Sequence, residues 1–222
     1  MKIKRRKGDI VIPIVVAAVA LFGVVAVYSA SRYICEEDYG NGFYFALKQL
    51  IGFFGGLIAM FFTMHFDYKK YFKAAKWLYL CGLLLLALVF VPGLGVRVYG
   101  AARWINLRLF TVQPSEIARL FLVIFLAAYF AENPKRAKSF KGVLIPIISS
   151  LACAVLIMLE PNMSVTVCVA ATVFVILFAA GVRLKTFLVL LVPVLALIPF
   201  LIISEPYRLK RLVAFLNPWA SP

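Results

Sequence analysis

Long apolar runs recur along the whole chain and constrain its fold more than any other feature. They cover roughly residues 10–30, 44–65, 77–92, 115–131, 143–159, 163–181 and 186–203. A helix needs about 20 predominantly apolar residues, and about 17 at the least, to cross the hydrocarbon core of a membrane. With 64% hydrophobic residues, the 222-residue chain cannot be a soluble globular domain. The sequence predicts an all-α, polytopic transmembrane helical bundle of seven spans, with residues 1–222 forming a single integral membrane domain.

The first run follows a basic segment, MKIKRRK, and has two interpretations. A cleaved signal peptide would also combine basic residues with an apolar stretch. This run is longer than a typical signal-peptide core, however, and Val27-Tyr28-Ser29-Ala30 is a poor cleavage site. We therefore interpret residues 10–30 as the first spanning helix.

The distribution of basic residues predicts the orientation. If the N-terminus is cytoplasmic, the inward segments 1–9, 66–76, 132–142 and 182–186 hold 15 of the 24 Lys and Arg residues. The positive-inside rule favours this arrangement, in which residues 204–222 begin an extracytoplasmic loop. It also explains the formal charge of +15 without nucleic acid as a partner. A seven-helix receptor or retinal protein is set aside, since its N-terminus would lie outside and the last span here lacks a Schiff-base lysine.

The four cysteines and the end of the chain give two further expectations. Cys35, Cys81, Cys153 and Cys168 show no CxxC or Cys/His spacing, so we interpret them as packing residues without a disulfide framework or metal site. The chain ends shortly after its last apolar run. We therefore expect a truncated extracytoplasmic loop.

Residues 100–119 carry costly charges from a basic loop directly into an apolar helix. Pro114 suits the first helical position, and Glu116 then lies near the positive end of the helix dipole. Glu116 and Arg119 are three residues apart and can pair on one helix face. Glu116 acting only as a helix cap is the simpler alternative. Ionisable residues in a span cost about 2.5–3.5 kcal/mol each on insertion scales, which favours a functional polar cavity.

Further charges are expected on the same outer side of the membrane. Glu160 ends the fifth run beside Pro161, although a lone interfacial glutamate is more often solvated than functional. Three outer-loop arginines run against the positive-inside trend, and a basic amphipathic pattern follows in the tail; these residues are Arg97, Arg103, Arg108, Arg208, Lys210 and Arg211. Guanidinium groups suit phosphate, so these cations could hold a lipid-linked phosphate or pyrophosphate. The alternative interpretation is that these cations depart from the positive-inside trend by chance and have no function.

Six short motifs occur in order along the chain. They are Gly100-Ala101-Ala102-Arg103-Trp104-Ile105, Gln113-Pro114-Ser115-Glu116, Glu160-Pro161, Ala180-Gly181-Val182-Arg183-Leu184, Tyr207-Arg208-Leu209-Lys210-Arg211 and Asn217-Pro218-Trp219. In this combination, collinear from residue 28 to residue 222, they resemble the SEDS family. Its members FtsW, SpoVE and RodA act in bacterial cell division, sporulation and elongation. The tail is more similar to FtsW and SpoVE than to RodA.

The resemblance implies a peptidoglycan glycosyltransferase of about ten spanning helices. Such an enzyme polymerises lipid II at the outer face of the bacterial cytoplasmic membrane, together with a class B penicillin-binding protein and other division proteins. Combined with the charge pattern, it predicts a set of substrate-binding residues: Arg103, Gln113, Ser115, Glu116, Arg119, Glu160, Arg208 and Arg211. Whether a divalent cation serves as cofactor stays open, since no metal site is readable in the sequence.

The sequence also departs from the family pattern. Arg119 stands where lysine is usual, and Asn162, Asn217 and Ser221 stand where aspartate is usual. The family's catalytic aspartate lies in the loop after the seventh helix, beyond residue 222, so no acid of this chain is assigned that role. We therefore expect an inactive, truncated form. Two rival functions stay open, namely a lipid-linked precursor flippase or transporter, and a non-catalytic division scaffold.

Overall fold

A computed structural model describes residues 10–98, 101–106, 111–204, 209 and 213–214. The chain divides into two compact units, residues 1–70 and 71–222. Seven α-helices and one short 3-10 helix dominate both units. Helices α1 to α5 are long and apolar enough to cross a membrane, whereas α6 and the apolar stretch Leu184–Leu197 of α7 are shorter. The chain is thus a helical, multi-pass membrane protein.

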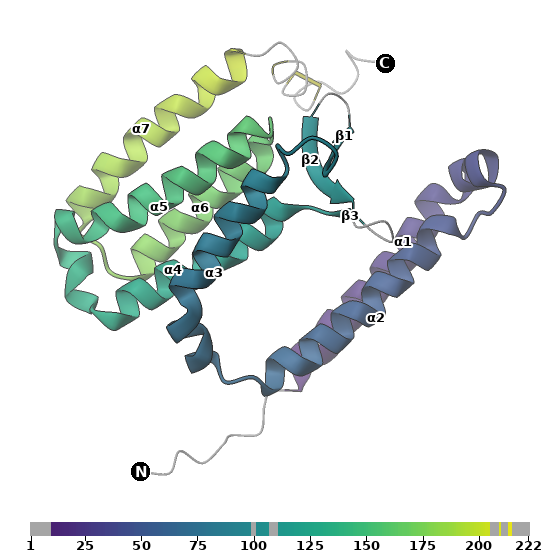
Figure 1. Ribbon diagram of the computed structural model, residues 1–222, viewed down its shortest axis with the longest axis horizontal. Coiled ribbons are helices and arrows are strands. Elements are labelled where there is room, and N and C mark those ends of the chain that lie inside the picture. The colour runs from purple at the N-terminus through teal and green to yellow at the C-terminus, as the bar shows by residue number, and fades with distance from the viewer. Residues whose placement is uncertain (1–9, 99–100, 107–110, 205–208, 210–212, 215–222) are drawn as a thin grey trace. The chain divides into compact units, whose positions relative to one another are not determined.

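The first unit contains a hairpin of two long helices, α1 (Val11–Tyr39) and α2 (Tyr44–His65) (Figure 1). Gly40 ends α1 in the left-handed conformation that glycine adopts easily. The backbone N–H of Gly42 then donates to the Glu36 carboxylate at 2.9 Å. Helix α1 therefore continues to Tyr39, nine residues beyond the predicted span 10–30. Good helix formers such as Arg32, Glu36 and Glu37 extend it until the first glycine.

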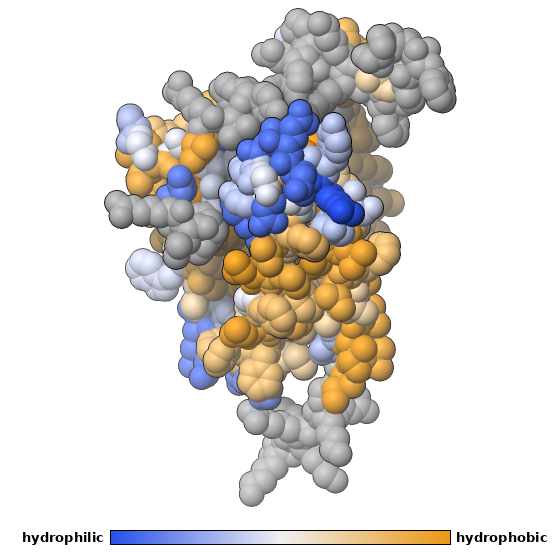
Figure 2. All heavy atoms as spheres, turned by 90° about the vertical axis from the view of Figure 1, so that its right-hand side faces the viewer, coloured by the Kyte–Doolittle hydropathy of each residue, from blue (hydrophilic) through white to orange (hydrophobic). Residues whose placement is uncertain are grey.

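The surface of this hairpin suits contact with lipid. Large apolar side chains such as Phe22, Phe54 and Phe62 are more than half exposed along both helices. Figure 2 shows a broad hydrophobic band on the face that it presents, with hydrophilic residues gathered above it. Exposed apolar surface of this extent is typical of a protein that faces a membrane.

The second unit packs helices around α4 (Pro114–Glu132). Its other helices are α3 (Tyr68–Leu88, shared with the first unit at its start), η1 (Pro134–Lys138), α5 (Phe140–Leu159), α6 (Met163–Ala179) and α7 (Leu184–Ile203). Leu122 and Leu126 of α4 are almost fully buried against Ile157 of α5 and other apolar residues. This packing fixes the positions of the helix ends, where the polar residues lie.

A small antiparallel sheet lies at the end of this unit where α4 begins (Figure 1). It consists of β1 (Gly95–Val98), β2 (Ala101–Asn106) and β3 (Thr111–Val112), in the order β1-β2-β3. An irregularity between Val96 and Arg97 shifts the register of the first pair. The sequence analysis treated residues 93–112 as a loop. The β-branched and aromatic residues alternating with others in this segment favour strands, and the long apolar runs obscured that weaker signal.

The contact between α3 and α4 gives the first testable prediction. A Cβ atom at Gly82 would lie 3.1 Å from the Cα atom of Ala118, so a larger side chain must displace a helix backbone. Gly82→Leu is expected to lower stability by about 1–3 kcal/mol, measured by thermal unfolding in detergent. Gly56→Leu is the control, since nothing lies within 4 Å of a Cβ atom there. Equal melting temperatures for both variants would contradict this packing.

Candidate functional site

Arg103 connects the sheet to a distant helix corner. The residue lies on β2, and its guanidinium reaches the turn between α5 and α6. Its Nε donates to the carbonyl of Glu160 at 3.1 Å, and one terminal nitrogen donates to the carbonyl of Pro161 at 2.5 Å. Hydrogen bonds from a charged donor are stronger than neutral ones. Arg103 therefore fixes the sheet against a corner 57 residues further along the chain.

Glu160 forms the buried part of this corner. It follows the last residue of α5, and the residue is only 1% exposed. Both carboxylate oxygens lack a hydrogen-bond partner among the described residues. Burial raises the pKa of Glu160 to about 7, while the positive charge of Arg103 opposes this rise. Near neutral pH, Glu160 can therefore carry a proton within this corner.

This raised pKa predicts how stability depends on pH. The folded protein holds the Glu160 proton up to a pKa of about 7, whereas an unfolded glutamate loses it near 4.5. Stability should therefore be highest below pH 4.5 and fall as the pH rises towards 7, by up to roughly 3 kcal/mol. Thermal unfolding of Glu160→Gln across this range should show a flatter profile than the wild type. Parallel profiles would show that Glu160 is ionised in the folded protein.

The start of α4 supplies a second group of polar residues. Gln113 precedes the helix in an extended conformation and Pro114 occupies its first turn, as the sequence predicts. Ser115 is fully buried, and its hydroxyl has no hydrogen-bond partner among the described residues. Arg119 donates to the Glu116 carboxylate at 2.5 Å, with their side chains 34% and 46% exposed. This ion pair thus presents both charges at the surface of the helix.

The structure brings the predicted residues together only in part. Strand β2 contacts α4, and α4 contacts both α5 and α6, so the two groups belong to the same end of one helical unit. No hydrogen bond or ion pair is recorded between the Arg103–Glu160 group and the Glu116–Arg119 pair within the described part of the chain. Arg108, Arg208 and Arg211 lie outside the described residues.

Asn162 is a buried polar residue of this corner, and its burial was not predicted from the sequence. Asn162 is only 7% exposed in the corner beside Pro161. Its backbone carbonyl accepts a hydrogen bond from the Thr166 hydroxyl at 3.0 Å. The only sequence feature that could have indicated this burial is the position of Asn162 directly after Glu160-Pro161.

The described residues at this end of the unit include cations that suit an anionic group. No group of three or more His, Cys, Asp or Glu residues able to hold a metal ion occurs in the described part of the chain. The guanidinium of Arg103 has five N–H donors in general, of which two are used by the carbonyls of the corner. The remaining donors of Arg103, and separately Arg119 on α4, can stabilise negative charge on a phosphate group.

Comparisons with known proteins identify the family of the chain. Residues 9–222 match the family described as cell cycle protein, FtsW/RodA/SpoVE. The chain is 34% identical to stage V sporulation protein E of Bacillus subtilis over 223 residues, covering all of this chain and 61% of that protein. It is 36% identical to the probable peptidoglycan glycosyltransferase FtsW of Geobacter metallireducens, covering 96% of this chain and 57% of that protein.

The chain is also similar to solved structures of related proteins. A chain described under "Structural coordination of polymerization and crosslinking by a peptidoglycan synthase complex" has a TM-score of 0.69 at 26% identity, covering 91% of this chain and 59% of that one. The rod shape determining protein RodA of Thermus thermophilus has a TM-score of 0.60 at 27% identity, covering 80% and 58%. The chain thus spans about three fifths of the length of these relatives. It belongs to the FtsW/RodA/SpoVE family of cell cycle proteins.

Proposed function

We propose that the intact protein is a peptidoglycan glycosyltransferase that polymerises lipid II at the outer face of the cytoplasmic membrane. The N-terminus of the chain would then lie in the cytoplasm, and residues 204–222 outside. Family membership supports the reaction, since relatives such as the FtsW of Geobacter metallireducens are named as probable peptidoglycan glycosyltransferases. The basic segments 66–76 and 132–142 support the orientation.

The observation that carries this proposal is the grouping of Arg103, Glu116, Arg119 and Glu160 at one end of a single helical unit. Glycosyl transfer forms a bond from an acceptor hydroxyl oxygen to the anomeric carbon of the donor. It breaks the bond from that carbon to the pyrophosphate, which leaves with the electron pair. Cations placed where this negative charge develops lower the barrier. Arg103 and Arg119 would provide such charge, whereas no acid in residues 1–222 is assigned the role of general base.

The arginine–glutamate pair on α4 would position the substrate. Ion pairing holds the Arg119 guanidinium close to the helix surface, which reduces the entropy lost when it binds a phosphate group. The Gln113 amide lies at the start of the same turn and offers further hydrogen bonds. The Ser115 hydroxyl is fully buried, so it would have to become exposed to contact the substrate. Arg208 and Arg211 stay in the proposal as further phosphate-binding residues from the tail.

A class B penicillin-binding protein is the proposed partner, together with other division proteins. Support comes from the structural relative that forms part of a peptidoglycan synthase complex coordinating polymerisation and crosslinking. Nucleic acid is not proposed as a partner, since the basic residues follow the membrane topology.

Two assays on the intact protein separate this function from its rivals. Purified with its penicillin-binding partner and labelled lipid II, the protein should produce glycan strands resolved by gel electrophoresis. In vesicles loaded with labelled lipid II, a flippase would move the lipid across the bilayer without forming polymer. Translocation alone would support the flippase, and neither activity, with partner binding retained, would support a scaffold.

A further inference from the structure

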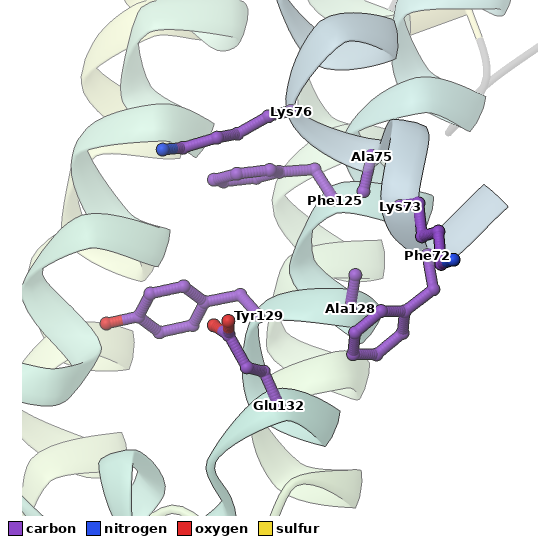
Figure 3. Close-up of a pocket in the computed structure, with 8 residues that line it drawn as sticks. All are labelled: Phe72, Lys73, Ala75, Lys76, Phe125, Ala128, Tyr129 and Glu132. Atoms are coloured by element: carbon purple, nitrogen blue, oxygen red, sulfur yellow. The ribbon is translucent and has the colours of Figure 1, made fainter. Parts of the chain in front are cut away.

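A pocket lies at the other end of α4, away from the sheet. It has a volume of about 370 Å³ and opens between the N-terminal part of α3 and the C-terminal part of α4. Figure 3 shows Lys76 extending alongside the ring of Phe125, with Tyr129 and Glu132 on the opposite wall. All of these residues belong to the second unit, so the pocket is formed within one compact body. None of them was singled out by the proposed function.

The walls of the pocket carry a net positive charge. Lys73 and Lys76 are exposed, and neither forms an ion pair with another residue in the described part of the chain. The single acid, Glu132, is neutralised by Arg136 at 2.6 Å. Two cations without a counter-charge therefore remain at the opening. A pocket of this charge favours an anionic ligand.

The floor of the pocket is held rigidly. Pro146 has no N–H to donate to the carbonyl of Gly142, and the Tyr129 hydroxyl donates to that carbonyl at 2.9 Å instead. Arg136 donates to the Tyr129 carbonyl at 2.9 Å, and its guanidinium lies 4.4 Å from the centre of the Tyr129 ring. The ring of Phe125 stacks on Tyr79 at 4.8 Å. The pocket is therefore preformed and needs little ordering on binding.

The surroundings of the pocket are those of a membrane interface. Trp77, next to Lys76, is 74% exposed, and exposed tryptophan is enriched at headgroup level. Further cations lie in the connection from α4 to α5, namely Lys135, Arg136, Lys138 and Lys141. Below the lysines, the lining is apolar and includes Phe72 and Ala128. A ligand with a negative head and an apolar body satisfies both parts of this lining.

From this geometry we infer that the α3–α4 pocket binds the headgroup of an anionic phospholipid. The phosphate lies at Lys76, whose side chain extends alongside Phe125, and Lys73 adds positive charge on the other side of the opening (Figure 3). The glycerol and the first part of an acyl chain contact Phe125 and Ala128. Basic pockets between membrane helices on the cytoplasmic side are suited to acidic lipid headgroups. A free phosphate ion would use the lysines but leave the apolar walls exposed to water. The site is distinct from the Arg103–Glu116 end and does not depend on the polymerase activity.

The test is native mass spectrometry of the chain titrated with phosphatidylglycerol or with phosphatidylcholine of the same acyl chains. Phosphatidylglycerol is expected to bind more tightly, and Lys73→Gln with Lys76→Gln should weaken its binding by roughly 10- to 30-fold. The control pair Lys135→Gln with Lys141→Gln removes equal charge from the same end and should leave binding unchanged. Ala128→Leu, which fills the pocket without changing charge, should also weaken binding.

Three results would overturn the inference. Equal binding of the two lipids would remove the role of headgroup charge. Equal weakening by both lysine pairs would show general attraction to a basic surface without a site. Displacement of phosphatidylglycerol by millimolar inorganic phosphate would show that the pocket takes the free ion.

Discussion

Replacing Arg103 with alanine is expected to lower the polymerisation rate of the intact protein by roughly 100-fold, the scale seen when one donor to a developing negative charge is removed. The same change removes both hydrogen bonds to the corner of α5 and α6. Stability should fall by about 2–4 kcal/mol, because these bonds come from a charged donor. Glycan synthesis from labelled lipid II and thermal unfolding measure the two effects separately.

Arg103→Lys is the matched control for this prediction. Lysine keeps the charge but cannot donate from two fixed nitrogens to two neighbouring carbonyls. Its polymerisation rate should lie between those of the wild type and the alanine variant. In Arg103→Ala, the pKa of Glu160 should rise further, because the positive charge of Arg103 opposes that rise in the wild type. Wild-type rate and stability in Arg103→Ala would contradict the role of this contact.

Glu116→Gln is expected to lower the polymerisation rate by about 10- to 100-fold with little change in stability. The Glu116–Arg119 pair spans three residues on a partly exposed helix face, so its loss should cost less than about 0.5 kcal/mol. The activity depends instead on the position of the Arg119 guanidinium, which the carboxylate fixes. Initial rates and melting temperatures of the purified variant distinguish the two effects.

Arg119→Lys is the control for the α4 pair. The resemblance to the SEDS family places lysine at this position, so the variant should keep most of its activity. A non-catalytic scaffold would respond differently, because cell division would then tolerate Glu116→Gln at normal protein levels. That tolerance, together with unchanged glycan synthesis, would remove Glu116 from the site.

The sequence predicted the helices well because a membrane imposes a strong pattern on them. The seven apolar runs fall on α1 to α7, of which α1 to α5 are long and apolar enough to cross a membrane. The corner at Glu160 lies between α5 and α6, as the end of the fifth run predicted, whereas α3 begins at Tyr68, well before the predicted run 77–92. The ends of the helices were predicted less accurately where polar residues continue a helix, as at Tyr39 of α1. The sheet at residues 95–112 was missed, since short strands give a much weaker signal than long apolar runs.

Only the contacts between residues close in sequence could be predicted for the candidate site. Glu116 and Arg119 lie on one helix face, and their spacing alone predicted that they can pair. The bonds from Arg103 to the carbonyls of Glu160 and Pro161 join parts of the chain 57 and 58 residues apart, which no local pattern encodes. The burial of Glu160 likewise depends on tertiary packing, because a glutamate at a helix end is usually solvated.

The most direct test of the central claim is photo-crosslinking of lipid II to the intact protein. A benzoylphenylalanine at Trp104, beside Arg103, probes the proposed substrate site, and the same residue at Trp77 probes the opposite end of the helices. Both tryptophans are exposed, at 36% and 74%, so both positions accept the probe. The proposed function predicts that labelled lipid II crosslinks strongly at position 104 and weakly at position 77. Equal crosslinking at both positions, or crosslinking at position 77 alone, would contradict it.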